Sequence, residues 1–131
     1  MDAAIAALDD VSSAVPDIMT IGPPANPPVA PFVGQAVLKH GRTTGLTFGS
    51  VVDTSFDGVV HYDSGVAYFE DQIVVAGNSG PFSGRGDSGS LILNSPDAHP
   101  VGLLFAGDDS QTIANPIQSV LNRFGATVAV T

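Results

Sequence analysis

Short runs of apolar and polar residues in near alternation fill most of the chain after residue 33. They cover residues 33–39, 47–52, 59–62, 66–69, 72–75, 89–93 and 101–106. Runs of this kind, separated by turn residues about every 8–12 positions, are typical of an all-β sandwich or barrel. The pattern therefore predicts roughly six or seven short strands and leaves the choice between sandwich and barrel open.

Turn residues separate these runs. The sequence Gly41-Arg42-Thr43-Thr44-Gly45 stands between the first two, and Asp63-Ser64-Gly65 stands between residues 59–62 and 66–69. In the stretch Phe56-Asp57-Gly58-Val59 the Asp-Gly pair can supply the positive φ that a tight turn requires. We therefore predict a hairpin turn there as well.

One helix is predicted near the C-terminus. Asn115 is suited to the N-cap, Pro116 to the first helical position and Gly125 to the stop. Ile117, Val120, Leu121 and Phe124 form an apolar stripe at helical spacing. More and less apolar side chains alternate over residues 127–130, a pattern that fits either a terminal strand or a tail.

The N-terminal part has a different composition. Residues 2–8 predict a short strand, whereas residues 15–31 contain six prolines, two of them in each of the pairs 23–24 and 27–28. Proline lacks the N–H that a sheet ladder needs, so this stretch predicts an extended linker. We divide the chain into an N-terminal segment, residues 1–32, and a β domain, residues 33–131.

Composition excludes several classes of function. The chain has 131 residues, no cysteine and a net charge of −9 with only four basic residues, so a nucleic-acid partner is not expected. It shows neither a secretory signal pattern nor an apolar run of the ~20 residues that a membrane span needs. We expect a soluble protein without a membrane partner and without a thiolate metal site.

The stretch Gly84-Arg85-Gly86-Asp87-Ser88-Gly89-Ser90 carries the candidate chemistry. With the apolar residues 91–93 behind it, it resembles the nucleophile loop of trypsin-like serine peptidases. Residues 101–107 resemble the strand that walls the substrate pocket in that family, and residues 39–45 resemble the start of the second barrel in its bacterial members. Asp2, followed by small and apolar residues, resembles the triad aspartate.

The resemblance implies a fold and a set of roles. The fold would be a six-stranded Greek-key β-barrel, the second barrel of the trypsin-like fold, with residues 1–32 as a first-barrel strand remnant and inter-barrel linker. Ser88 would be the nucleophile and Asp2 the residue that orients the histidine. The remaining roles would be an oxyanion hole from the N–H groups of Gly86 and Ser88, a buried structural Asp87, and a substrate-binding edge of Phe105, Ala106 and Gly107.

The general base is the missing part. In this family the histidine precedes the aspartate, so with the aspartate at position 2 it would lie outside this sequence. His40, His61 and His99 lack the family's histidine context and the close spacing of a zinc site, so neither a substitute base nor a metal or cofactor is expected. Phe82 stands where basic-residue cleavers carry an acid, which disfavours a trypsin-type preference, although Asp108 and Asp109 at the pocket rim leave this open.

The sequence is compatible with three functions. The first is the C-terminal half of a serine endopeptidase acting on peptides or proteins, inactive without its histidine-bearing barrel. The second is a non-catalytic peptide-binding or assembly module derived from that half. The third, and weakest, is an adhesive loop, because residues 85–88 spell an integrin-recognition tetrapeptide. Since the barrel would keep an apolar face for its partner, we also expect a homo-oligomer through residues near 1–32.

Overall fold

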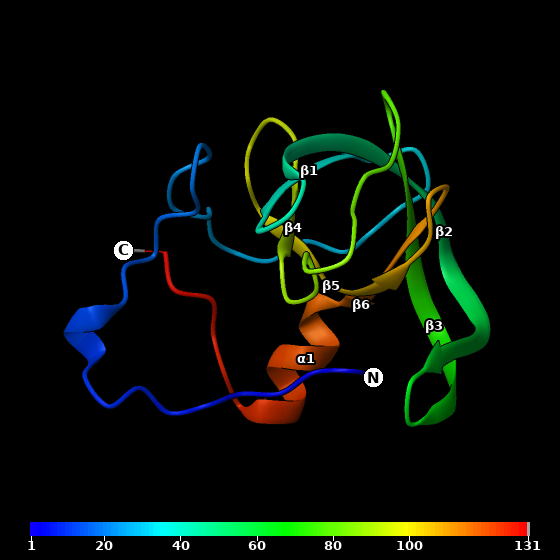
Figure 1. Cartoon of the computed structure of the whole chain (residues 1–131). Coiled ribbons are helices and arrows are strands. Elements are labelled where there is room, and N and C mark those ends of the chain that lie inside the picture. Colours follow the sequence, from blue (N-terminus) through cyan, green and yellow to red (C-terminus); the bar gives the residue numbers. More distant parts are fainter. Residues whose placement is uncertain (131) are drawn as a thin grey trace.

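The computed structural model describes residues 1–130, in which six antiparallel strands close into a barrel (Figure 1). The elements are η1 (Val11–Ser13), β1 (Ala36–Gly41), β2 (Gly45–Tyr62), β3 (Gly65–Gly77), β4 (Leu91–Asn94), β5 (Pro100–Gly107), β6 (Thr112–Pro116) and α1 (Ile117–Phe124). Around the ring the order is β1-β2-β3-β6-β5-β4, so β4 returns beside β1 in a Greek-key path. The all-β class, the six-stranded barrel and the single C-terminal helix are confirmed.

Mostly branched aliphatic side chains fill the barrel. The buried cluster contains Val37, Val51, Ile73, Val75, Phe82, Ile92, Val101, Leu104 and Ala114, with Val29 of the linker packed against it. Every second residue of a strand points to the same face of the sheet, so each strand contributes side chains to this interior. The core thus explains the alternation of the sequence, and it fixes the strand ends from which the functional loops emerge.

The hairpin of β2 and β3 corrects one prediction. Asp57 and Gly58 lie inside β2, and the chain reverses after Tyr62, which pairs with Gly65. The register shifts on either side of Phe56, and Asp57 Oδ1 accepts the Asp71 N–H at 2.9 Å. Two steps along β2, from Phe56 to Gly58, match three steps along β3, so the Asp-Gly pair lies opposite a β-bulge at Glu70 and Asp71 and forms no turn. The reversal at Asp63 and Ser64 was predicted correctly.

Residues 1–35 lie outside the barrel and contain no long strand (Figure 1). The predicted strand over residues 2–8 is wrong, because these residues have no ladder partner in the described chain. The proline-rich stretch forms no barrel strand, as predicted, but it turns back at residues 18–22 and is not extended throughout. Two backbone hydrogen bonds hold its later part: Ala25 N–H to Ala98 O and Val29 N–H to Pro100 O, both 2.9 Å. The linker thus follows the loop before β5.

The C-terminal part needs two more corrections. Residues 112–116 form β6, which was not predicted, and Asn115 belongs to this strand and is fully buried instead of capping the helix. Helix α1 buries Ile117 and Val120 and ends at Phe124, with the predicted stop residue Gly125 as its C-cap in a left-handed conformation, φ 60°. Residues 126–130 form no strand. In the described part of the chain no helix is long and apolar enough to cross a membrane.

Glycine at position 49 permits the close approach of β2 to β3. Gly49 pairs with Gly77, and a Cβ at position 49 would collide with the Ala76 carbonyl oxygen and lie 2.9 Å from the Phe82 ring. The carbonyl belongs to the backbone and cannot rotate away. The tight curvature of the barrel at this point therefore depends on the absence of a side chain.

We expect Gly49→Ala to lower the free energy of unfolding by about 1–3 kcal/mol, the usual cost of overpacking a buried site. Urea denaturation measures it, with Ser55→Ala, an exposed position of the same strand, as the control. Equal stability of the two variants would contradict this description of the barrel.

Candidate active site

The loop of residues 84–90 turns twice in succession. Asp87 N–H donates to Gly84 O at 3.1 Å, and Ser90 N–H donates to Asp87 O at 3.0 Å. Gly86 and Gly89 have φ values of 98° and 90°, a region that L side chains rarely adopt. As a result Asp87 points inward and is fully buried, while the next residue, Ser88, is exposed.

The buried Asp87 carboxylate holds the loop in place. Oδ1 accepts the N–H groups of Thr43 and Thr44 at 2.8 and 3.2 Å. Oδ2 accepts the Thr44 hydroxyl at 2.6 Å and the Gly84 N–H at 2.9 Å. Gly41 is necessary here, because a Cβ at that position would overlap the carboxylate. One side chain therefore joins the β1–β2 turn to the loop that carries Ser88.

Lys39 of β1 neutralises this carboxylate. Its fully buried Nζ lies 3.7 Å from Asp87 Oδ2 and donates to Thr44 Oγ1 at 2.6 Å and Gly45 O at 3.0 Å. Burial lowers the pKa of Lys39 more than the neighbouring Asp87 raises it. Burial alone would raise the pKa of Asp87, but the hydrogen bonds from Thr44, Gly84 and Thr43 outweigh it and lower the pKa to about 2.

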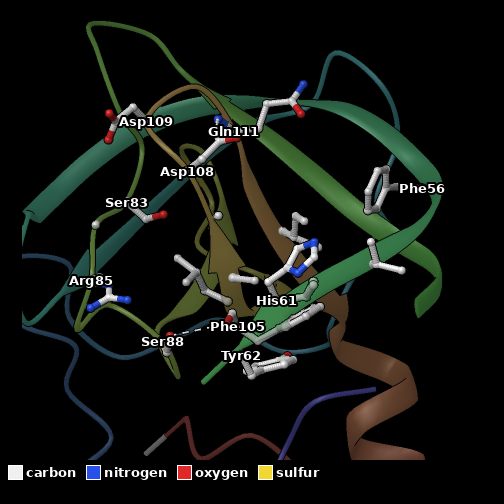
Figure 2. Close-up of a pocket in the computed structure, with 17 residues that line it drawn as sticks. Phe56, His61, Tyr62, Ser83, Arg85, Ser88, Phe105, Asp108, Asp109 and Gln111 are labelled. Atoms are coloured by element: carbon white, nitrogen blue, oxygen red, sulfur yellow. Dashed lines mark hydrogen bonds between the residues drawn. The ribbon is translucent and has the colours of Figure 1, made fainter. Parts of the chain in front are cut away.

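Strand β5 forms the wall beside Ser88. Gly89 N–H donates to Leu104 O at 2.8 Å, and Leu104 N–H donates to Ser90 O at 3.0 Å. Ser88 Oγ donates to Phe105 O at 3.4 Å (Figure 2). The predicted nucleophile and the predicted substrate-binding edge are thus adjacent. Within residues 1–130 the N–H groups of Gly86 and Ser88 donate to no protein acceptor.

A cavity of about 840 Å³ opens at this place. The loop contributes Gly84, Arg85 and Ser88, the preceding residue Ser83 also lines the cavity, and β5 contributes Leu104, Phe105, Ala106 and Gly107. The remaining lining residues come from β2, β6 and the turn between β5 and β6: Phe56, Val59, Val60, His61, Tyr62, Asp108, Asp109, Gln111 and Ile113. The predicted rim acids Asp108 and Asp109 do lie here, together with Arg85 and His61, which the sequence analysis did not assign to the site (Figure 2).

Asp2 lies at the edge of this region without belonging to a strand. Its N–H donates to Asn115 Oδ1 at 3.0 Å, and its carbonyl oxygen accepts Asn115 Nδ2 at 2.7 Å. Its carboxylate accepts the Tyr62 hydroxyl at 2.6 Å. Sequence reasoning missed both partners, because Asn115 fits a helix cap equally well and Tyr62 is one of several aromatic strand residues.

The histidines do not assemble around Ser88. His40 Nδ1 lies 2.9 Å from Thr20 Oγ1, and His99 Nδ1 lies 2.6 Å from Pro27 O. His61 lines the cavity, but the Ser88 hydroxyl has Phe105 O as its partner. In residues 1–130 no group of three or more His, Cys, Asp or Glu side chains has the geometry of a metal site.

The prediction of an adhesive loop at residues 85–88 is wrong. An Arg-Gly-Asp motif needs an accessible carboxylate, whereas the carboxylate of Asp87 is fully buried and accepts four hydrogen bonds. The Asp87 carboxylate therefore stabilises the loop and is not available to a binding partner.

We expect Asp87→Asn to lower the free energy of unfolding by about 3–5 kcal/mol, because it leaves Lys39 buried without a counter-charge. Chemical denaturation at pH 7 measures it, with the exposed turn residue Asp63→Asn as the matched control. Since the folded pKa of Asp87 lies near 2 and its ordinary value is 3.8, its stabilisation is complete above pH 4 and is lost as the pH falls through 2. The difference between wild type and Asp87→Asn should therefore shrink over that interval. A constant difference would contradict this assignment.

Comparisons with known proteins identify a family and two curated relatives. The family described as Nal1 C-terminal domain matches residues 4–122. The protein NARROW LEAF 1 of Oryza sativa subsp. japonica is 36% identical over 84 residues, which are 61% of this chain and 14% of that protein. Streptogrisin-A of Streptomyces griseus is 36% identical over 103 residues, 74% of this chain and 31% of that protein.

Solved structures show the same barrel. A glutamic acid-specific serine protease, described as using a histidine triad in substrate binding, is 25% identical to this chain with a TM-score of 0.61. The match covers 81% of this chain and 54% of the protease chain. Thermobifida fusca protease A is 20% identical with a TM-score of 0.64, and the match covers 89% of this chain and 62% of the protease chain. The chain thus spans less than two thirds of each of these relatives. It belongs to the Nal1 C-terminal domain family, and its barrel is that of the C-terminal half of trypsin-like serine proteases.

Proposed function

We propose that this chain is the C-terminal half of a serine endopeptidase and supplies the nucleophile Ser88, the oxyanion hole and the substrate pocket. The observation that carries the proposal is an exposed serine held at the rim of a cavity by a buried carboxylate on the neighbouring residue. A nucleophile must stay fixed relative to the bound carbonyl group, because small displacements cost large factors in rate. The hydrogen bonds of Asp87 provide this rigidity.

The chemistry follows from the positions of the backbone groups. Ser88 Oγ attacks the carbonyl carbon of a peptide bond, and its proton passes to a histidine that later protonates the leaving amine. The N–H groups of Gly86 and Ser88, which have no protein acceptor among residues 1–130, remain available for the oxyanion. Backbone groups of Phe105–Gly107 would pair with the extended substrate.

The histidine would come from outside this chain. His40 and His99 are bound elsewhere, and Ser88 Oγ contacts a carbonyl oxygen instead of an imidazole. The matches also cover only 54% and 62% of the two solved peptidases. The natural source is a histidine-bearing barrel, either in the same polypeptide or in a partner.

A second candidate is a peptide-binding or assembly module without catalysis. The observation that favours it is the lack of any Ser–His contact in the described residues. Such a module would bind extended peptide at the same β5 edge, but Ser88 would stay unreactive.

We expect the isolated chain to show no measurable peptide hydrolysis, because a serine hydroxyl without a base is a weak nucleophile at neutral pH. Loss of the histidine from such a triad costs about 10⁶-fold in kcat. A fluorophosphonate probe should not label the isolated chain, but it should label Ser88 when the histidine-bearing half is present, with Ser88→Ala as the control.

Labelling of the isolated chain at Ser88 would mean that one of its own histidines acts as the base, with His61 as the first candidate. Failure to label Ser88 in the complete protein would favour the non-catalytic module instead. The two outcomes therefore separate the two functions.

We also propose that the isolated chain self-associates through residues near 1–32. Apolar side chains of this segment are 55–80% exposed: Ile5, Leu8, Val11, Val15 and Met19. Residues 2–8 form no strand, so the support for self-association is this exposed apolar surface. If these side chains came together, they would form an apolar surface of the kind that soluble monomers rarely leave exposed.

Sedimentation equilibrium over a concentration series should show a dimer or larger species. The triple variant Ile5→Ser, Leu8→Ser, Val11→Ser should weaken it and leave the barrel folded. A single species at the 13.3 kDa chain mass at high concentration would contradict the proposal.

A further inference from the structure

We infer that Tyr62 is a positioning residue for peptide hydrolysis, which holds the Asp2 carboxylate in place while Asn115 holds the Asp2 backbone. The inference rests on the proposed function, because a fixed carboxylate matters for the reaction only if Asp2 orients a histidine. It goes further by naming the residues of this chain that fix Asp2. Neither of them lies near Asp2 in the sequence.

The backbone of Asp2 is held by one buried side chain. Asn115 of β6 is fully buried and makes two hydrogen bonds to the same residue, accepting the Asp2 N–H at 3.0 Å and donating to the Asp2 carbonyl oxygen at 2.7 Å. This paired arrangement reproduces what a neighbouring strand would provide. It explains how a segment without strand structure keeps Asp2 at a defined place beside the barrel.

The carboxylate is held by a second element. Tyr62 is the last residue of β2, and its hydroxyl donates to Asp2 Oδ2 at 2.6 Å. Tyr62 also lines the cavity that contains Ser88, so it links the carboxylate to the wall of the site (Figure 2). Within residues 1–130 no donor binds Asp2 Oδ1. One oxygen is therefore occupied by Tyr62, and the other is available for a histidine N–H.

The ionisation state of Tyr62 suits this role. Burial, together with the hydrogen bond and charge of Asp2, raises the pKa of Tyr62 to about 12. The phenol thus keeps its proton and donates to the carboxylate throughout the neutral range. A carboxylate held at both backbone and side chain cannot turn away when a histidine approaches. Its orientation is set before the two halves meet, which limits the ordering needed at that moment.

The contact can be tested in this chain without any activity, because the chain has only two tyrosines. With ¹³C-labelled tyrosine, the Cζ resonance of Tyr62 should move when Asp2 is changed in Asp2→Ala at neutral pH. The resonance of Tyr68, an exposed residue of β3, should stay in place. Tyr68→Phe assigns the two signals. An unchanged Tyr62 resonance would overturn the contact and the inference with it.

The catalytic role is tested in the complete protein, with the histidine-bearing half present. We expect Tyr62→Phe, which keeps the ring and removes only the hydroxyl, to lower kcat about ten- to hundredfold and to change KM less than about twofold. Tyr68→Phe is the matched control and should leave both constants unchanged. Thermal unfolding of Tyr62→Phe separates the roles, since a merely structural tyrosine would lower Tm and leave kcat intact.

The possible failures are distinct. A Tyr62→Phe protein with wild-type kcat, in which Ser88 is still labelled by a fluorophosphonate, would overturn the positioning role and leave the proposed function standing. Absence of Ser88 labelling in the complete wild-type protein would overturn the proposed function, and the catalytic role of Tyr62 would fall with it. The Cζ comparison decides the contact in either case.

Discussion

The buried carboxylate of Asp87 is the interaction on which the site depends. It accepts hydrogen bonds from the β1–β2 turn and from Gly84, and Lys39 supplies the opposite charge. A desolvated charge is costly unless it is paired and hydrogen-bonded, so these partners have little freedom to rearrange. Because Asp87 must point inward, Ser88 must point outward. The exposure of the candidate nucleophile is thus a consequence of the burial of its neighbour.

The barrel could be predicted from local patterns because its strands alternate and its turns use characteristic residues. The errors occurred where a distant partner overrides a local preference. Asp57-Gly58 has the composition of a turn, but the Asp57 carboxylate binds the Asp71 N–H and stabilises a bulge. Asn115 suits a helix cap, yet its amide binds the backbone of Asp2, 113 positions away. A rule that uses only neighbouring residues cannot identify either of these distant partners.

The candidate site divides in the same way. The loop of Ser88 and the edge of Phe105–Gly107 are contiguous motifs, so the sequence alone identified them, and the structure brings them together. Lys39, Tyr62 and Asn115 reach the site from β1, β2 and β6, and only the closed barrel reveals their proximity. Ser88 and its support Asp87 share one contiguous motif, whereas Lys39, Tyr62 and Asn115 act through contacts between distant strands.

We propose that Ser88 acts with a histidine that this chain does not contain. A crystal structure of the complete protein with a peptidyl phosphonate would test it most directly. We expect phosphorus bonded to Ser88 Oγ, a phosphonyl oxygen about 2.7–3.1 Å from the N–H groups of Gly86 and Ser88, and a histidine from outside this chain between Ser88 and Asp2. An adduct on another residue, or His61 in the place of that histidine, would contradict it.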